Sequence, residues 1–306
     1  MTTVSKSPTT IENTFNEFAA VMRPRIDREL SRLLPPETEA PANVHSAMRW
    51  SVFAGGKRFR PLLVLVAAET FGADRESLLS TACAFEFIHT YSLIHDDLPS
   101  MDNDELRRGQ PTCHVRYGEG IAILAGDALQ TLAFKTISES EQLSFETRVH
   151  LIRELSQAAG TPLGMVAGQA EDLAAESQTV NSKELEKIHR LKTGALIIAA
   201  TRCGAIIAGA DERELAAVTE YANSLGLLFQ ITDDLLDVTA TAETLGKTPG
   251  KDARSEKATY PALYGVDLAR ERALHVHSEA CSALEKIKRP TDCLHSIADF
   301  ILQRSA

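Results

Sequence analysis

Residues 83–109, CAFEFIHTYSLIHDDLPSMDNDELRRG, join a mostly apolar run to a dense acidic cluster. Like charges at this density repel one another unless a cation neutralises them. The charged residues of the cluster are Asp96, Asp97, Asp102, Asp104 and Glu105, followed by Arg107 and Arg108. We assign no role to Asp104 and Glu105, which fit a solvated surface.

The apolar run predicts a helix that ends close to this cluster. His89, Ser92 and Asp96 are separated by three and seven residues and therefore share one helix face. Pro99 must end or distort the helix, because its ring clashes with the carbonyl four residues back. Asp102 is therefore expected to return toward Asp96 along a bend.

The rest of the chain repeats apolar residues at intervals of three and four, and alternating strand patterns are scarce. Several segments are apolar on most sides, which indicates burial inside a large bundle. The helical patterns cover 11–34, 43–56, 61–72, 76–97, 120–137, 146–160, 184–209, 212–238 and 259–287. No linker divides them, so we predict a single all-α domain over residues 1–306, with a flexible polar segment at residues 1–10.

Composition excludes several classes of function. The chain has 306 residues, 44% of them hydrophobic, and a net charge of −10, which disfavours nucleic-acid binding. Its five cysteines lack CxxC spacing and read as reduced thiols of a cytoplasmic protein. The first residues lack the apolar core of a signal peptide, and no run of about 18 apolar residues predicts a membrane span.

A second acidic cluster, QITDDLLD, lies in the helical pattern 212–238. Gln230, Asp233, Asp234 and Asp237 are related by three, four and seven residues, so we expect them on one helix face. A solvated charged face is the alternative, but the flanking residues SLGLLFQI and LLDV are apolar. Carboxylates on an apolar helix are costly without a partner, which favours metal binding.

Mg²⁺ is usually held by one or two protein carboxylates together with substrate phosphates. Two facing aspartate clusters therefore predict a site with several Mg²⁺ ions that binds a polyphosphate. A calcium loop is disfavoured because no D-x-[DN]-x-[DN]-G pattern occurs.

Basic residues predict a second anion site. GGKRFRP places Lys57, Arg58 and Arg60 beside Pro61, where a helix start and its free N–H groups favour an anion. Arg107 and Arg108 follow the first acidic cluster, and Lys192–Thr193 interrupt an apolar helix. Singly, each could be a solvated charge. Together with the aspartates, they describe one anion site bridged by Mg²⁺ and one that is purely basic.

Six motifs in this order resemble the trans-isoprenyl diphosphate synthases, and among them most closely the bacterial farnesyl diphosphate synthases. The motifs are GGKRFRP, HTYSLIHDDLPSMDNDELRRGQPT, GMVAGQAEDL, LKTGALI, LLFQITDDLLD and LGKTPGKDARSEKATYP. The resemblance covers roughly residues 40–304 and ends with the similar tail FILQRSA. It implies one bundle around a deep central cavity, usually in a homodimer, and head-to-tail condensation of isopentenyl diphosphate with dimethylallyl and then geranyl diphosphate.

The resemblance also implies roles for individual residues. The ligands of about three Mg²⁺ ions on the allylic diphosphate would be Asp96, Asp97, Asp102 and Asp233, with Asp237 partly through water. The same diphosphate would contact Arg107, Lys192 and Lys247, with Lys257 nearby. Isopentenyl diphosphate would be bound by Lys57, Arg60, His89 and Arg108. Thr193 and Gln230 would lie near the developing allylic cation.

The resemblance further implies that product length depends on the residues four and five positions before Asp96, which are Ser92 and Tyr91. Tyr91 lies about 7.5 Å along the helix axis from Asp96, where a large ring should stop elongation early. The alternative is a core packing role, because Tyr91 is about 140° around an ideal helix from Asp96 and Ser92 only about 40°.

Four other functions stay open. A geranylgeranyl or geranyl diphosphate synthase differs only in product length. A terpene cyclase would not need the basic site that GGKRFRP predicts. A non-catalytic partner subunit usually lacks one aspartate motif, and both are intact here. A solvated scaffold would show no Mg²⁺-dependent binding of diphosphates.

Overall fold

The computed structural model describes residues 8–175, 180–239 and 259–304, and this part of the chain is almost entirely helical, as expected. The helices of the first half are α1 (Pro8–Leu33), α2 (Ala42–Val52), α3 (Phe59–Thr70), the 3-10 helix η1 (Arg75–Leu78), α4 (Leu79–Asp96), α5 (Cys113–Tyr117), α6 (Glu119–Ser138) and α7 (Phe145–Ala159). Those of the second half are α8 (Met165–Ala175), α9 (Ser182–His189), the π-helix η2 (Arg190–Gly194), α10 (Ala195–Ile207), α11 (Glu212–Thr239), α14 (Tyr260–Tyr264), α15 (Val266–Leu284) and α16 (Asp292–Gln303).

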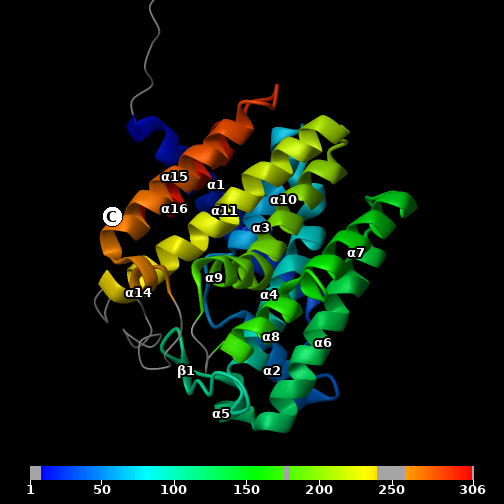
Figure 1. The fold of residues 1–306 in the computed structure, drawn as a ribbon. Coiled ribbons are helices and arrows are strands. Elements are labelled where there is room, and N and C mark those ends of the chain that lie inside the picture. The colour runs from blue at the N-terminus through cyan, green and yellow to red at the C-terminus, as the bar shows by residue number, and fades with distance from the viewer. Residues whose placement is uncertain (1–7, 176–179, 240–258, 305–306) are drawn as a thin grey trace, which may run out of the picture.

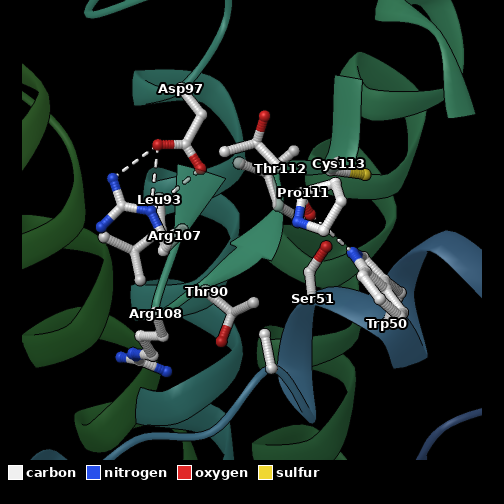
Figure 2. A pocket seen from close by; sticks show the side chains of 12 residues that line it. Trp50, Ser51, Thr90, Leu93, Asp97, Arg107, Arg108, Pro111, Thr112 and Cys113 are labelled. Atoms are coloured by element: carbon white, nitrogen blue, oxygen red, sulfur yellow. Dashed lines mark hydrogen bonds and ion pairs between the residues drawn. The ribbon is translucent and has the colours of Figure 1, made fainter. Parts of the chain in front are cut away.

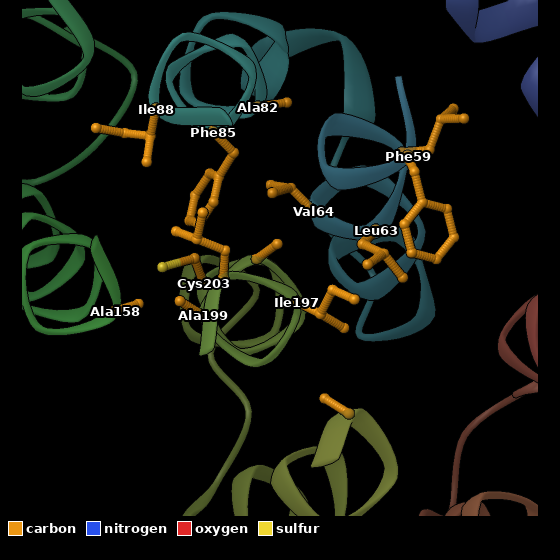
Figure 3. Packing of buried hydrophobic residues seen from close by; sticks show 14 of the residues in the cluster. Phe59, Leu63, Val64, Ala82, Phe85, Ile88, Ala158, Ile197, Ala199 and Cys203 are labelled. Carbon is orange, nitrogen blue, oxygen red and sulfur yellow. The ribbon is translucent and has the colours of Figure 1, made fainter. Parts of the chain in front are cut away.

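Helix α4 lies inside the bundle and carries the first acidic cluster at its end. It packs against α6, α3 and α1, while α11 packs against α15 and α10 (Figure 1). Phe85 and Phe87 of α4 are fully buried. Figure 3 shows Val64 of α3, Phe85 of α4 and Ile197 of α10 converging in the core. Because this core fixes α3, α4 and α10, it also fixes the charged residues at their ends.

A short β-hairpin follows the first acidic cluster and was not predicted. Strands β1 (Leu106–Arg107) and β2 (Gln110–Pro111) pair antiparallel, with Leu106 opposite Pro111 and Arg107 opposite Gln110. The two turn residues, Arg108 and Gly109, have φ of 53° and 75°. Both angles are positive, as the two-residue hairpin turn of type I′ requires.

Several helix boundaries differ from the sequence prediction. Helix α1 begins at Pro8, so residues 8–10 of the segment expected to be flexible are helical; proline suits the first turn of a helix. Residues 1–7 lie outside the described residues. The expected helix over 184–209 contains the π-helix η2, and the chain adds α8 and α16, which the patterns did not delimit.

Helix α6 is, among the described residues, the one helix long and apolar enough to cross a membrane by length and composition, which the sequence reading did not anticipate. A core helix passes the same test, so this is weak evidence for a span. Helix α6 packs against α4, α2, α5 and α7.

Candidate active site

The first acidic cluster forms the bend that the sequence predicted. Helix α4 ends at Asp96, and the N–H of Asp102 donates to the Asp96 carbonyl at 2.8 Å. Burial raises the pKa of the Asp96 carboxyl to about 6; nearby Lys192 opposes this shift and Asp102 adds to it. Asp96 is therefore a partly buried carboxylate whose charge the surrounding protein only partly compensates.

Asp97 has different surroundings from Asp96. It is 3% exposed, and both of its carboxylate oxygens accept hydrogen bonds from Arg107 of β1, at 2.5–3.0 Å (Figure 2). Asp97 was expected to bind metal directly. In the structure both carboxylate oxygens of Asp97 are instead bound by the guanidinium of Arg107, a residue that the resemblance assigned to the allylic diphosphate.

The second acidic cluster divides in the same way. Asp233 accepts a hydrogen bond from Arg304 at 3.1 Å, and its side chain is 44% exposed. Asp234 is 3% exposed and accepts from the Gln230 amide at 3.1 Å and from the backbone N–H of Tyr260 at 3.0 Å. Both aspartates therefore have partners within the protein, and the hydrogen bond from Gln230 to Asp234 joins two of the four residues expected on one helix face. Asp237 is half-buried.

The π-helix η2 brings Lys192 and Thr193 to the same region. Lys192 pairs with Asp172 of α8 at 2.7 Å, and the Thr193 hydroxyl donates to Gln230 at 2.9 Å. An added Cβ on Gly168 would lie 2.2 Å from the Lys192 backbone nitrogen, so only glycine lets α8 approach η2 this closely. One-turn π-helices occur often at functional sites because they shift side chains out of α-helical register.

A basic cluster lies on the other side of the hairpin turn and contains Arg60, His89 and Arg108. Burial lowers the pKa of His89 well below its ordinary value, and Arg60 and Arg108 lower it further. Burial lowers the pKa of Arg60 to about 10, and its Nε atom is buried without a hydrogen-bond partner. Within the described part of the chain neither arginine forms an ion pair, although Arg108 donates to the Gly55 carbonyl.

The remaining basic residues of GGKRFRP have separate environments. Arg58 has a left-handed backbone, is 4% exposed, and pairs with Asp27 at 2.7 Å and Glu86 at 2.8 Å. It is therefore a structural residue. The Lys57 ammonium lies 6.0 Å from the centre of the Phe300 ring, and burial together with Arg304 lowers its pKa.

The two residues expected to set product length lie on α4. Tyr91 is 5% exposed, and its ring contacts the His95 ring edge-on at 5.8 Å. Burial raises the pKa of the Tyr91 hydroxyl. The Ser92 hydroxyl donates to the His89 carbonyl within the same helix, at 2.9 Å. Of these two residues, Tyr91 is therefore the one with a bulky, buried side chain.

Sequence reasoning missed two partners of the second acidic cluster. His189 places Nε2 3.4 Å from Asp234 Oδ2, and its ring stacks on Tyr260 with centroids 5.8 Å apart. One feature of the sequence could have indicated His189: it stands two residues before LKTG, on the same helical segment as Lys192. Lys247 and Lys257 lie outside the described residues.

The donor set fits a hard cation. Among the described residues, no three His, Cys, Asp or Glu side chains are grouped closely enough to hold an ion by themselves. Mg²⁺ does not require such a group, since it commonly binds one or two carboxylates and completes its shell with phosphate oxygens and water. A cation beside Asp96 and Asp102 would stabilise the charged form of Asp96, whose pKa is raised first by burial and then by repulsion from Asp102.

Comparison with known proteins identifies consistent relatives. The polyprenyl synthetase family matches residues 41–294. The chain is 47% identical to the farnesyl diphosphate synthase of Escherichia coli K12 over 285 residues, covering 91% of this chain and 95% of that one. It is 48% identical to the farnesyl diphosphate synthase of Geobacillus stearothermophilus over 272 residues, covering 88% and 89%. The geranylgeranyl pyrophosphate synthetase structure from Pyrococcus horikoshii Ot3 superposes with a TM-score of 0.85 at 32% identity, covering 94% and 99%.

Proposed function

The chain belongs to the polyprenyl synthetase family, and we propose from this premise that it condenses isopentenyl diphosphate with dimethylallyl and then geranyl diphosphate to form (2E,6E)-farnesyl diphosphate. The all-α fold and the activity of a prenyltransferase, both expected from the resemblance, are confirmed by the family match and the relatives. The two farnesyl diphosphate synthases match over 88–91% of this chain, whereas geranylgeranyl pyrophosphate synthases of similar identity, 47–49%, match over 78–80% of it; the longer match supports the fifteen-carbon product.

The observation that carries the proposal is the separation of charge around the hairpin turn. Asp96 and Asp102 provide carboxylates on one side, and on the other Arg60 and Arg108 provide guanidinium groups that form no ion pair with the residues the structure describes. A chain that binds one diphosphate through a metal and a second through basic residues alone needs both kinds of site. A cyclase, which uses a single diphosphate, would have no use for the second.

We assign the metal-facing role to Asp96, Asp102 and Asp233, with Asp237 as a weaker contributor. Asp97 and Asp234 are each only 3% exposed and are bound by Arg107 and by Gln230 and Tyr260, whereas the other four are more accessible, so we place Asp97 and Asp234 behind the metal ligands as supports. About three Mg²⁺ ions, when bound, neutralise the charge that develops on the leaving diphosphate.

The protein's own residues complete the reaction. Lys192 and Arg107 donate to the leaving diphosphate, as preorganised cations should. The Thr193 hydroxyl donates a hydrogen bond to the Gln230 amide oxygen, so its own oxygen lone pairs remain available to face the allylic cation. The isopentenyl double bond attacks that cation, and the departed diphosphate accepts the proton that is lost. Surrounding helices exclude water, which would otherwise trap the cation.

One assay tests the function. Labelled isopentenyl diphosphate is supplied with Mg²⁺ and with each allylic starter, and product length is measured by chromatography. We expect farnesyl diphosphate from dimethylallyl and geranyl diphosphate. Absence of elongation with every starter would contradict the proposal, and a hydrocarbon formed from geranyl diphosphate alone would identify a cyclase.

We also propose that the enzyme acts as a homodimer in the cytoplasm. Helices α5, α6 and α7 pack in sequence and expose large apolar side chains that a second copy could cover. These side chains are Val115, Ile123, Leu124, Phe145 and Val149. Light scattering on the purified protein should give twice the chain mass, and a monomeric mass would contradict the proposal.

A further inference from the structure

The hairpin β1–β2 presents two successive arginines to two different sites. Arg107 binds Asp97, on the side of the proposed allylic diphosphate. Arg108 lies beside Gly55 and Gly56, on the side of the proposed isopentenyl diphosphate site; an added Cβ on Gly56 would come 2.7 Å from its guanidinium. Whatever sets the position of this hairpin therefore sets both arginines together.

The hairpin is too short to hold its own shape. Each strand has two residues, and isolated two-stranded hairpins are at best marginally stable in water. Arg108 also has a left-handed backbone, with φ of 53°, which a residue with a side chain seldom adopts unless its surroundings enforce it. The position of the hairpin must therefore come from contacts with other elements.

Trp50 of α2 makes the contact that anchors β2. Its indole Nε1–H donates to the Pro111 carbonyl at 3.1 Å (Figure 2). The guanidinium of Arg116 lies 3.7 Å from the centre of the indole ring. Arg116 belongs to α5, the helix that follows the hairpin in the chain, so this helix also holds the ring in place. The Thr112 hydroxyl closes the base of the hairpin by donating to the Asp104 carbonyl at 2.7 Å.

Packing alone does not fix the hairpin. A cavity of about 30 Å³ lies between it and helices α2 and α4, lined by Trp50, Asp97, Arg107, Arg108 and Thr112 among others. A space of this size can hold a water but is not filled by side chains. Side-chain packing under the hairpin is therefore incomplete, and directional contacts such as the Trp50 hydrogen bond contribute to its position.

We propose that Trp50 is a positioning residue that restrains the hairpin and thereby places Arg107 and Arg108 for the two diphosphates at once. This inference rests on the proposed function, because the two arginines are assigned to the two substrates there. Trp50 touches neither substrate and acts through the β2 backbone.

Replacing Trp50 by phenylalanine tests the inference. Trp50→Phe keeps an aromatic ring for Arg116 and removes the N–H donor together with the five-membered ring of the indole. We expect KM for isopentenyl diphosphate and KM for geranyl diphosphate to rise together by about fivefold, since one hydrogen bond contributes a factor of this order. The thermal midpoint should stay within about 2 °C of the wild type.

Tyr221→Phe is the matched control. The Tyr221 hydroxyl also donates one hydrogen bond to a backbone carbonyl, that of Leu294 at 2.7 Å, but in the core between α11 and α16. This variant should lose stability and keep both KM values. The inference is wrong if Trp50→Phe changes neither KM or only one, or if Tyr221→Phe raises both equally.

A binding measurement separates this inference from the proposed function. Trp50 is the only tryptophan in the chain, so its fluorescence reports on the hairpin directly. Addition of isopentenyl diphosphate, or of geranyl diphosphate with MgCl₂, should change the wild-type emission with saturation near each KM. Elongation without any emission change would overturn the role of Trp50 alone, whereas a wild type that elongates no starter would overturn the function itself.

Discussion

Both acidic clusters contain a pair of adjacent aspartates, and in both the second aspartate is the buried one. Asp97 and Asp234 are each 3% exposed, while Asp96 and Asp233 are more accessible. The pairs differ in what binds the buried member. Asp97 is bound by a cation, Arg107, whereas the oxygens of Asp234 accept hydrogen bonds from the neutral Gln230 amide and a backbone N–H.

This difference indicates two uses for the same dipeptide. Asp97 holds a substrate-binding arginine in place, so its loss should act mainly on binding. Asp234 joins η2, α11 and α14 through the series Thr193, Gln230, Asp234 and Tyr260, so its loss should act mainly on stability. Asp96 and Asp233 face the proposed metal ions, so their loss should act on catalysis.

The largest expected effect is on kcat/KM, and it separates the accessible aspartates of the two pairs from the buried ones. Asp96→Asn and Asp233→Asn should each lower kcat/KM by about 1,000-fold, because a preorganised group at the developing charge is lost. Asp97→Asn should lower it by about tenfold, through a less well-held Arg107. Steady-state kinetics with labelled isopentenyl diphosphate measure these values, and Glu105→Gln, at an exposed residue of the same cluster, should change them less than about twofold. Equal losses at Asp96 and Asp97 would remove the distinction.

The next effect is on stability and depends on pH. Folding raises the pKa of Asp96 from an ordinary value of 3.8 to about 6, so the folded protein binds this proton more tightly than the unfolded chain. That contribution to stability is fully present below about pH 4 and is lost as pH rises through 6. In EDTA at pH 7.5, Asp96→Asn should therefore be more stable than the wild type by up to about 3 kcal/mol, and the difference should vanish near pH 4. Urea unfolding at both pH values tests this, and a gain that does not depend on pH would contradict it.

A smaller stability effect distinguishes the two buried aspartates. Asp234→Ala leaves the Tyr260 N–H and the Gln230 amide without their acceptor and should cost about 2–3 kcal/mol. Asp97→Ala should cost less, about 1 kcal/mol, since the Arg107 guanidinium keeps the carboxylate of Asp104 at 3.9 Å and the charges of Asp96 and Asp102 nearby. Unfolding free energies from urea titrations compare the two, and a larger cost at Asp97 would reverse our interpretation.

The smallest effect on rate is expected at Tyr91, which lies on α4, the helix that ends in the first acidic cluster. Tyr91→Ala removes the buried ring that we expect to limit the growing chain, so the main product should shift from fifteen toward twenty carbons while turnover stays within about threefold. Chromatography of the products measures this, with Ser92→Ala as the control on the same helix. An unchanged product profile would assign Tyr91 to core packing.

The sequence was sufficient to predict the parts of the fold in which apolar residues recur at a helical period. Apolar periodicity predicted most helices, and Pro99 predicted the bend that returns Asp102 to Asp96. It could not predict the hairpin at Leu106–Pro111, because strands of two residues show no alternation. Nor could it predict η2, because a π-helix of five residues is too short to change the apolar periodicity of the helical pattern around it.

The site was predictable by residue type and less so by orientation. Both aspartate clusters and the basic residues were found from their composition and spacing. Helical geometry did not show that Asp97 and Asp234 turn to partners inside the protein, because those partners come from Arg107 and Tyr260, on other elements. His189 was missed for the same reason: its partner Asp234 is 45 residues away in sequence.

The left-handed backbone at Arg58 has a consequence for genetic experiments. It turns the middle basic residue of GGKRFRP toward Asp27 and Glu86, away from its neighbours Lys57 and Arg60. In a saturation mutagenesis screen scored by growth, losses at Arg58 and Arg60 would be indistinguishable. A screen scored by protein abundance in the cell should separate them, because Arg58 variants would be depleted by proteolysis while Arg60 variants would accumulate as inactive, folded enzyme.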